Sequence, residues 1–96
     1  MSIQVLDFYA DWCGPCKTQG PIFEEVKEEF EDNSTVTFEK VDVEEDQDRA
    51  NRYNVKSIPS IIIIEKDEDD EITLLERFVG VTEKDALEEA IQEHLD

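Results

Sequence analysis

The two cysteines are the residues whose types and spacing most directly suggest chemistry. Cys13 and Cys16 are the only cysteines among 96 residues, and they lie in the segment Trp12–Lys17, which reads WCGPCK. A β-prone run precedes them, and Gly14-Pro15 favours the start of a helix at this point. Free N–H groups and the dipole at a helix N-terminus stabilise a Cys13 thiolate. Cys16 follows one turn later, so Cys13 can attack a substrate disulfide and Cys16 can resolve the mixed disulfide.

The sequence gives less support to three other roles for the two cysteines. A zinc site needs about four ligands, and beyond the two thiols the chain offers only His94 in a distant segment. Haem attachment requires a His directly after the second Cys, where this sequence has Lys17. A purely structural disulfide at this spacing closes too small a loop to add much stability. The sequence therefore predicts a redox-active Cys13–Cys16 disulfide, with no metal site and no bound cofactor.

The elements that must position this pair alternate between strand and helix patterns. The expected strands are Ile3–Tyr9, Thr35–Val43, Ser60–Glu65 and Ile72–Val79, and the expected helices run from Gly14-Pro15 to about Glu31, over Asp46–Tyr53, and from Thr82 to the C-terminal region. A helix between two strands makes a right-handed crossover with parallel strands, and the run Ile61–Ile64 indicates burial on both faces. The order is βαβαββα, which predicts one α/β domain over residues 1–96.

The last helix has a recognisable start and an apolar face. Thr82, with Asp85 three positions later, resembles a capping box. Its expected buried face consists of the apolar residues at helical spacing, namely Ala86, Leu87, Ala90, Ile91 and Leu95.

A carboxylate lies six residues before Cys13. Asp7 shares a strand face with Ile3 and Val5, so we expect it to be screened from water, and desolvation would raise its pKa. It could then take the proton from Cys16 as resolution begins, although a partly exposed, merely tolerated Asp is the alternative. Lys40 alternates with apolar residues on the second strand, and it could either pair with Asp7 or be an edge-strand charge.

With these residues assembled, the chain resembles the thioredoxin family over nearly its whole length. The resemblance rests on WCGPCK after the strand VLDFYAD, on Ile58-Pro59 before the Ile-rich strand, and on the segment Phe78–Val81 after the last strand. It implies that Pro59 is a cis-proline facing the cysteines. It also implies a buried carboxylate at Asp7 with Lys40 as its lysine neighbour. The substrate groove that it implies consists of Trp12, Gly14, Pro15, Ile58, Pro59, Val79, Gly80 and Val81.

The fold implied is the thioredoxin fold, a four-stranded mixed sheet in the order 2-1-3-4 with helices on both faces. Thioredoxins usually begin with a further strand and helix, whereas here the strand carrying Asp7 starts at residue 3. In outline the chain is closer to a glutaredoxin. We expect the second strand to lie at a sheet edge and the short helix around Ala50 to cover one face almost alone.

Composition excludes several classes of partner. Nine Lys and Arg against 27 Asp and Glu give a net charge of −18, which repels nucleic acid and anionic membranes. No run approaches the roughly 18 apolar residues of a membrane span, and the N-terminus does not resemble a secretory signal, so we expect a cytoplasmic protein. The acidic excess favours a salt-rich, halophilic cytosol over an ordinary acidic protein.

The sequence thus predicts a thiol-disulfide oxidoreductase that reduces protein disulfides through the Cys13/Cys16 cycle. Its expected partners are disulfide-containing target proteins and a thioredoxin reductase or equivalent electron donor, and the chain is expected to be a monomer. Two alternatives stay open: a glutaredoxin-like or oxidase/isomerase role, and a non-catalytic interaction module of the same fold.

Overall fold

The computed structural model describes residues 1–95, and the predicted element order βαβαββα is confirmed. The elements are β1 (Ser2–Tyr9), α1 (Gly14–Glu29), β2 (Val36–Asp42), α2 (Gln47–Arg52), β3 (Ser60–Lys66), β4 (Ile72–Val79) and α3 (Lys84–Leu95). The largest boundary errors are of two residues: α1 was expected to end at about Glu31 and ends at Glu29, and α3 was expected to begin at Thr82 and begins at Lys84.

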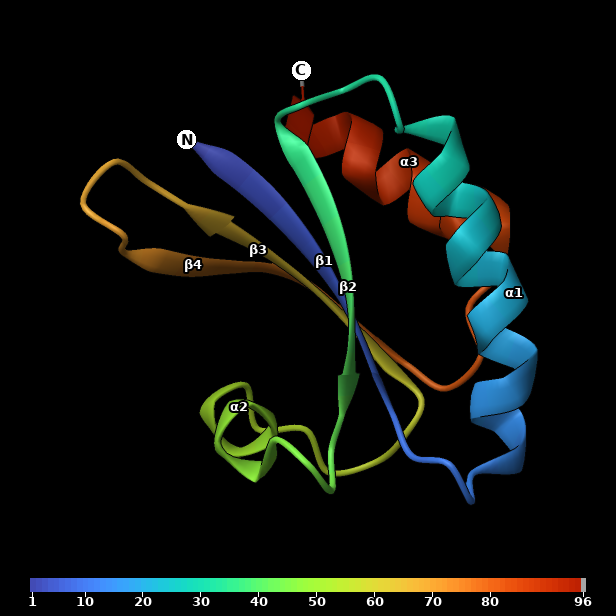
Figure 1. The fold of residues 1–96 in the computed structure, drawn as a ribbon. Coiled ribbons are helices and arrows are strands. Elements are labelled where there is room, and N and C mark those ends of the chain that lie inside the picture. The colour runs from blue at the N-terminus through green and yellow to red at the C-terminus, as the bar shows by residue number, and fades with distance from the viewer. Residues whose placement is uncertain (96) are drawn as a thin grey trace.

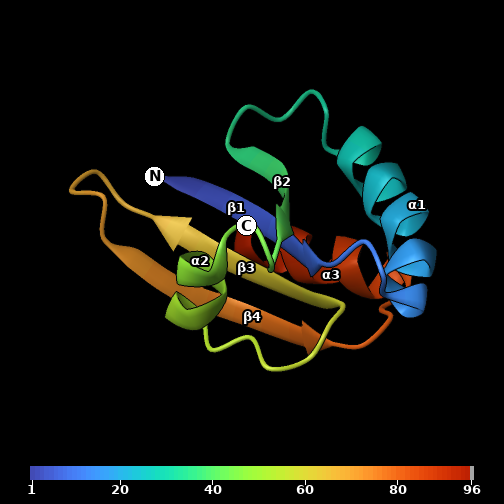
Figure 2. The ribbon, with the colours of Figure 1, turned by 60° about the horizontal axis from the view of Figure 1, so that its bottom comes forward.

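The four strands form one mixed sheet in the predicted order β2-β1-β3-β4. β1 pairs with β2 in parallel and with β3 antiparallel, and β4 completes the sheet antiparallel to β3. Figure 1 shows α1 and α3 together on one face of this sheet and α2 on the other, and Figure 2 shows the strands side by side in their order. The expected helices on both faces are therefore confirmed, and β2 lies at an edge.

Alternation along β1 divides the core between the two faces. Ile3 and Val5 pack with Phe23 and Val26 of α1 on one side, whereas Leu6 and Phe8 pack on the side of α2. The run Ile61–Ile64 in β3 contributes to both clusters and is at most 1% exposed, which confirms its burial on both faces. Asp7 follows Ile3 and Val5 in the alternation and thus lies on the face covered by α1 and α3.

Two expectations for the last helix are wrong. α3 begins at Lys84, so Thr82 lies outside the helix, and its hydroxyl donates to the backbone oxygen of Gly80 at 3.1 Å instead of capping α3. Ala86 is exposed, because the buried stripe is narrower than expected and consists of Leu87, Ala90 and Ile91. Thr82 instead belongs to the connection between β4 and α3.

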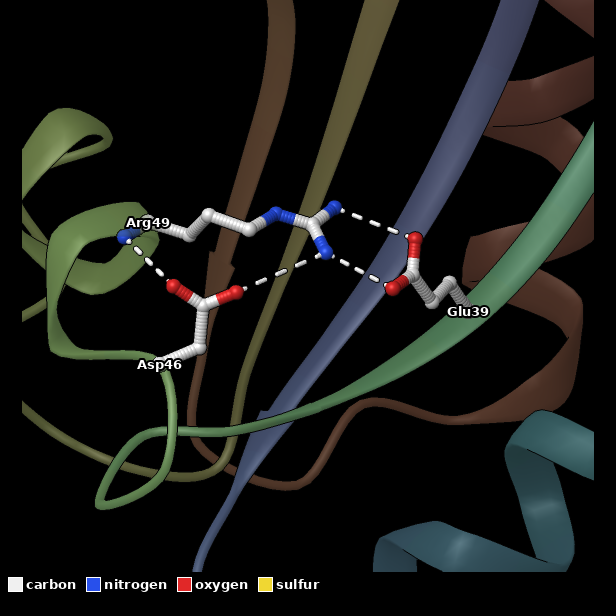
Figure 3. A network of polar contacts seen from close by, with 3 residues as sticks. All are labelled: Glu39, Asp46 and Arg49. Carbon is white, nitrogen blue, oxygen red and sulfur yellow. Dashed lines mark hydrogen bonds and ion pairs between the residues drawn. The ribbon is translucent and has the colours of Figure 1, made fainter.

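The short helix α2 is held in place by ion pairs and hydrogen bonds. The Arg49 guanidinium donates to both carboxylate oxygens of Glu39 in β2, at 2.7 and 3.1 Å, and Asp46 accepts the backbone N–H of Arg49. Figure 3 shows these three residues between α2 and β2. From the other side, the Arg77 guanidinium in β4 donates to the backbone oxygen of Tyr53 at 2.6 Å. A six-residue helix is unstable alone, so these contacts fix the only helix seen on its face within residues 1–95.

Candidate active site

The two cysteines lie where β1 gives way to α1. Cys13 is the N-cap residue of α1, and in this structure it forms a disulfide with Cys16. The Cys13 Sγ also accepts the backbone N–H of Cys16 at 3.2 Å. The two residues are similarly shielded, at 4 and 5% exposed. The predicted junction of strand and helix is confirmed, and the Cys13 sulfur lies where a helix terminus favours negative charge.

Asp7 is fully buried, as the strand alternation predicted. Neither of its carboxylate oxygens has a hydrogen-bond partner among the described residues. Burial raises the pKa of Asp7 from its ordinary 3.8 to about 6, while the positive charge of Lys40 lowers it and the negative charge of Glu24 raises it further. A carboxylate with this pKa can exchange a proton at a pH close to neutral.

A surface depression of about 410 Å³ brings the surroundings of Asp7 and the cysteine pair together. Cys16, Lys40 and Glu24 are among the residues that line it. Lys40 and Glu24 are also the two charged residues that act on the pKa of Asp7. The second cysteine and the charges that tune the buried carboxylate therefore lie around one solvent-accessible space.

Direct pairing between Asp7 and Lys40 is not observed. The two residues are register partners on β1 and β2, but the Lys40 side chain is exposed and its ammonium lies 4.8 Å from the centre of the Tyr9 ring. The expected pairing therefore needs correction. Lys40 acts on Asp7 through its charge and not through a hydrogen bond, because the ammonium lies over the neighbouring aromatic ring.

The segment Ile58-Pro59 lies beside the cysteines. The peptide bond between these residues is cis, as the family resemblance implied. Ile58 packs against the cluster formed by Ala10, Cys13 and Cys16. The Pro59 backbone oxygen accepts the N–H of Gly80 at 2.9 Å, so the connection after β4 reaches the same place.

Exposed apolar side chains surround this junction. Trp12 is 67% exposed, Val79 is 62% exposed and Val81 is 41% exposed. Gly14 and Pro15 are exposed at the start of α1. Soluble domains seldom leave several large apolar groups exposed around one point without a partner that covers them.

Three nearby residues were not predicted from the sequence. Glu44 accepts a hydrogen bond from the Trp12 indole N–H at 3.0 Å, and Glu24 acts on Asp7 through its charge. Gln19 is completely buried in α1. The position of Gln19 in the sequence could have indicated its role. It falls between Cys16 and Phe23 on the buried side of the helix, where a polar side chain requires hydrogen-bond partners.

Within residues 1–95, no group of three or more His, Cys, Asp or Glu side chains is arranged to hold a metal ion. His94 lies on α3, where its Nε2 is 3.0 Å from a carboxylate oxygen of Glu76 in β4. In the same range, no helix is both long and apolar enough to cross a membrane.

Comparison with known proteins identifies the family. A family model described as Thioredoxin matches residues 1–93, which include both cysteines, Asp7, Pro59 and Gly80. The chain belongs to the thioredoxin family. A curated thioredoxin of Bacillus subtilis is 38% identical over 93 residues, which cover 97% of this chain and 83% of that protein.

Solved thioredoxin structures agree with this assignment. The thioredoxin of Trichomonas vaginalis superposes with a TM-score of 0.74 at 36% identity, over 98% of this chain and 79% of that one. A mutant thioredoxin of Halobacterium salinarum NRC-1 gives a TM-score of 0.79 at 33% identity, over 99% and 76% of the two chains. This thioredoxin-family chain is accordingly a thiol-disulfide oxidoreductase with a redox-active Cys13–Cys16 disulfide. Family membership implies disulfide-containing targets and a reductase in general terms.

Proposed function

We propose that this chain reduces disulfides in other proteins, with Cys13 as the attacking nucleophile and Cys16 as the resolving thiol. The observation that carries this assignment is the position of Cys13 as the N-cap of α1, where its sulfur accepts the Cys16 N–H. Exposure does not distinguish the two thiols, but the helix terminus favours the Cys13 thiolate.

The exchange proceeds in two balanced steps. The Cys13 thiolate attacks one sulfur of the target disulfide, which forms a mixed disulfide and releases the other target sulfur as a thiolate. The Cys16 thiolate then attacks the Cys13 sulfur, which forms the Cys13–Cys16 disulfide and releases the second target thiolate. The target gains two electrons, the dithiol loses two, and the released target thiolates take up protons according to their pKa values.

Asp7 is the proposed acceptor of the Cys16 proton in the second step. Its pKa of about 6 means that it is mostly ionised at neutral pH, yet its burial without a hydrogen-bond partner within residues 1–95 makes protonation favourable when a thiol proton is offered. Because Lys40 lowers the pKa of Asp7 and lines the same depression as Cys16, we assign it an electrostatic role in this transfer.

The apolar groups around the cysteines are the proposed groove for the target protein. Trp12, Ile58, Val79 and Val81 supply its apolar side chains. Pro59, Gly80, Gly14 and Pro15 supply its backbone walls. A target segment that flanks a disulfide would bury these side chains on binding, and apolar burial contributes about 25 cal/mol per Å².

The oxidised pair must be recharged by a separate reductase that delivers electrons from a nicotinamide, flavin or ferredoxin source. We place this cycle in the cytoplasm, because a dithiol that acts as a reductant requires a compartment in which thiols stay reduced. The net charge of −18 further supports a salt-rich cytosol, in which screening reduces self-repulsion.

Three measurements on the full chain test this proposal. With dithiothreitol as electron donor, it should reduce insulin catalytically, and it should exchange only slowly with glutathione. Its reduction potential should be about −270 mV, as for thioredoxins, whereas a strong disulfide oxidant has a potential of about −120 mV. Rapid exchange with glutathione would favour the glutaredoxin-like role, and an oxidising potential would favour the oxidase role. A dithiol that reduces neither substrate would favour the non-catalytic interaction module.

A further inference from the structure

Gln19 is a buried polar residue to which the disulfide-exchange cycle assigns no task. It lies in α1 three residues after Cys16, and its exposed fraction is 0%. Its side-chain amide makes two hydrogen bonds with one residue 63 positions away. The Gln19 Nε2 donates to the Thr82 backbone oxygen at 3.1 Å, and the Thr82 backbone N–H donates to the Gln19 Oε1 at 2.7 Å. A side-chain amide thus pairs with a backbone amide in the manner of a strand ladder.

These two bonds extend into the proposed groove. The Thr82 hydroxyl donates to the Gly80 backbone oxygen at 3.1 Å, and the Gly80 N–H donates to the Pro59 oxygen at 2.9 Å. A continuous series of hydrogen bonds therefore runs from the redox helix through the connection after β4 to the cis-proline. Gln19 supplies the contact that ties this connection to the helix carrying the cysteines.

The connection requires such a restraint. Gly80 has a φ of +88°, in the region that favours glycine, and it is flanked by Val79 and Val81, which are 62 and 41% exposed. Exposed flanking side chains supply little packing to hold this backbone. The two part-buried hydrogen bonds between Gln19 and Thr82 therefore supply much of the restraint on the segment between β4 and α3.

We propose that Gln19 is a positioning residue for target binding: its amide holds the Gly80–Val81 segment of the groove in register with the cysteine pair. This inference rests on the proposed groove. Gln19 lies outside the sequence motifs from which the groove was inferred. Because the amide is bonded to the Thr82 backbone and not to either sulfur, its loss should impair productive binding of a protein disulfide and leave the thiol chemistry unchanged.

The test compares Gln19→Met with wild type in the full chain. Methionine has similar length and fills the buried site without replacing either hydrogen bond. We expect kcat/KM for insulin to fall about three- to tenfold, mainly through a higher KM, since that range corresponds to the loss of hydrogen bonds of ordinary strength. The rate with a small aromatic disulfide and the reduction potential should stay at their wild-type values.

A second variant and a control separate positioning from stability. Gln19→Glu keeps an acceptor for the Thr82 N–H but turns an ionised carboxylate towards the Thr82 oxygen at a fully buried position, so at pH 8 its kcat/KM for insulin should be no higher than that of Gln19→Met. Val26→Ala removes buried apolar atoms from the same helix, away from the groove, and should lower the melting temperature without raising KM. Amide hydrogen exchange should show loss of protection at Thr82 in Gln19→Met and not in Val26→Ala.

Three outcomes would overturn the proposal. These are an unchanged KM for insulin despite lost protection at Thr82, an equal fall in rate for insulin and the small disulfide, and an equal rise in KM in Val26→Ala. Failure of the proposed function is a distinct result, since wild type itself would then not turn over insulin. The exchange measurement at Thr82 reports on the Gln19 contacts in either case.

Discussion

Replacing Asp7 by Asn should stabilise the oxidised protein at neutral pH and should not do so in acid. In the native structure the carboxylate is buried without a hydrogen-bond partner among the described residues, and its pKa is raised from 3.8 to about 6. The folded state therefore binds a proton more tightly than the unfolded state. As the pH rises from about 4 to about 6, ionisation of Asp7 becomes steadily more unfavourable to folding, and above pH 6 the whole penalty is present.

The size of this penalty follows from the two pKa values. A difference of one unit corresponds to 1.36 kcal/mol, so a rise from 3.8 to about 6 amounts to about 3 kcal/mol. This is a large fraction of the about 5–15 kcal/mol by which most domains are stable. Asparagine has the shape of the protonated acid and carries no charge, so the variant should gain about 3 kcal/mol at pH 8 and close to nothing at pH 3.5.

Urea unfolding of oxidised wild type and Asp7→Asn between pH 3.5 and pH 8 measures this difference directly. Because the disulfide is closed, the cysteine thiols do not titrate in the experiment. Asp11→Asn is the matched control, since it makes the same change in net charge at an exposed position. A stability difference between Asp7→Asn and wild type that stays constant across this pH range, or an Asn variant that is less stable at pH 8, would refute the reasoning.

Two further predictions concern the same site, and a third concerns the charge of the whole chain. Asp7→Asn should slow insulin reduction more at pH 7 than at pH 9, where Cys16 ionises unaided, and a pH-independent ratio of rates would count against Asp7 as the proton acceptor. Lys40→Gln removes a charge that lowers the pKa of Asp7, so the acid limb of the pH–activity profile should move to higher pH. Lys27→Gln is the control: Lys27 lies in α1 and does not line the depression beside Cys16, so its loss should not move the acid limb. The melting temperature should rise between about 0.05 and 2 M KCl, because the Debye length falls to about 3 Å and the repulsion among the charges that sum to −18 is screened. Sucrose, which strengthens apolar burial without screening charge, should also raise the melting temperature. A melting temperature that rises in sucrose but does not change with KCl would exclude the high-salt interpretation.

Much of the fold could be predicted from the sequence because short-range rules and topology agree here. Alternation around Asp7 placed it on a buried strand face, and the run Ile61–Ile64 indicated a strand covered on both sides. The Gly14-Pro15 dipeptide marked the start of α1 and thereby the position of Cys13 at its N-cap. The crossover and the hairpin indicated which neighbouring strands are parallel and antiparallel, whereas the full sheet order was implied by the family resemblance, and the structure confirms it.

The sequence did not predict the contacts of Lys40 and Thr82, because each of these side chains can reach more than one partner. For Lys40 two alternatives were open, pairing with Asp7 and an edge-strand charge; its side chain is exposed on the edge strand with the ammonium over Tyr9, and strand register alone does not decide between these contacts. Thr82 matched a capping pattern, yet its hydroxyl and its backbone bind Gly80 and Gln19. Contacts such as these depend on segments far apart in sequence, which periodicity does not bring together.

The central claim, that Cys13 attacks and Cys16 resolves, is tested most directly by trapping the mixed disulfide. Reduced Cys16→Ser and Cys13→Ser are each mixed with a disulfide-bonded target, and the products are analysed by mass spectrometry without reductant. Cys16→Ser should accumulate a covalent complex joined through Cys13, because resolution has lost its thiol, while Cys13→Ser should accumulate none. A complex that forms through Cys16 in Cys13→Ser, with none in Cys16→Ser, would contradict the account.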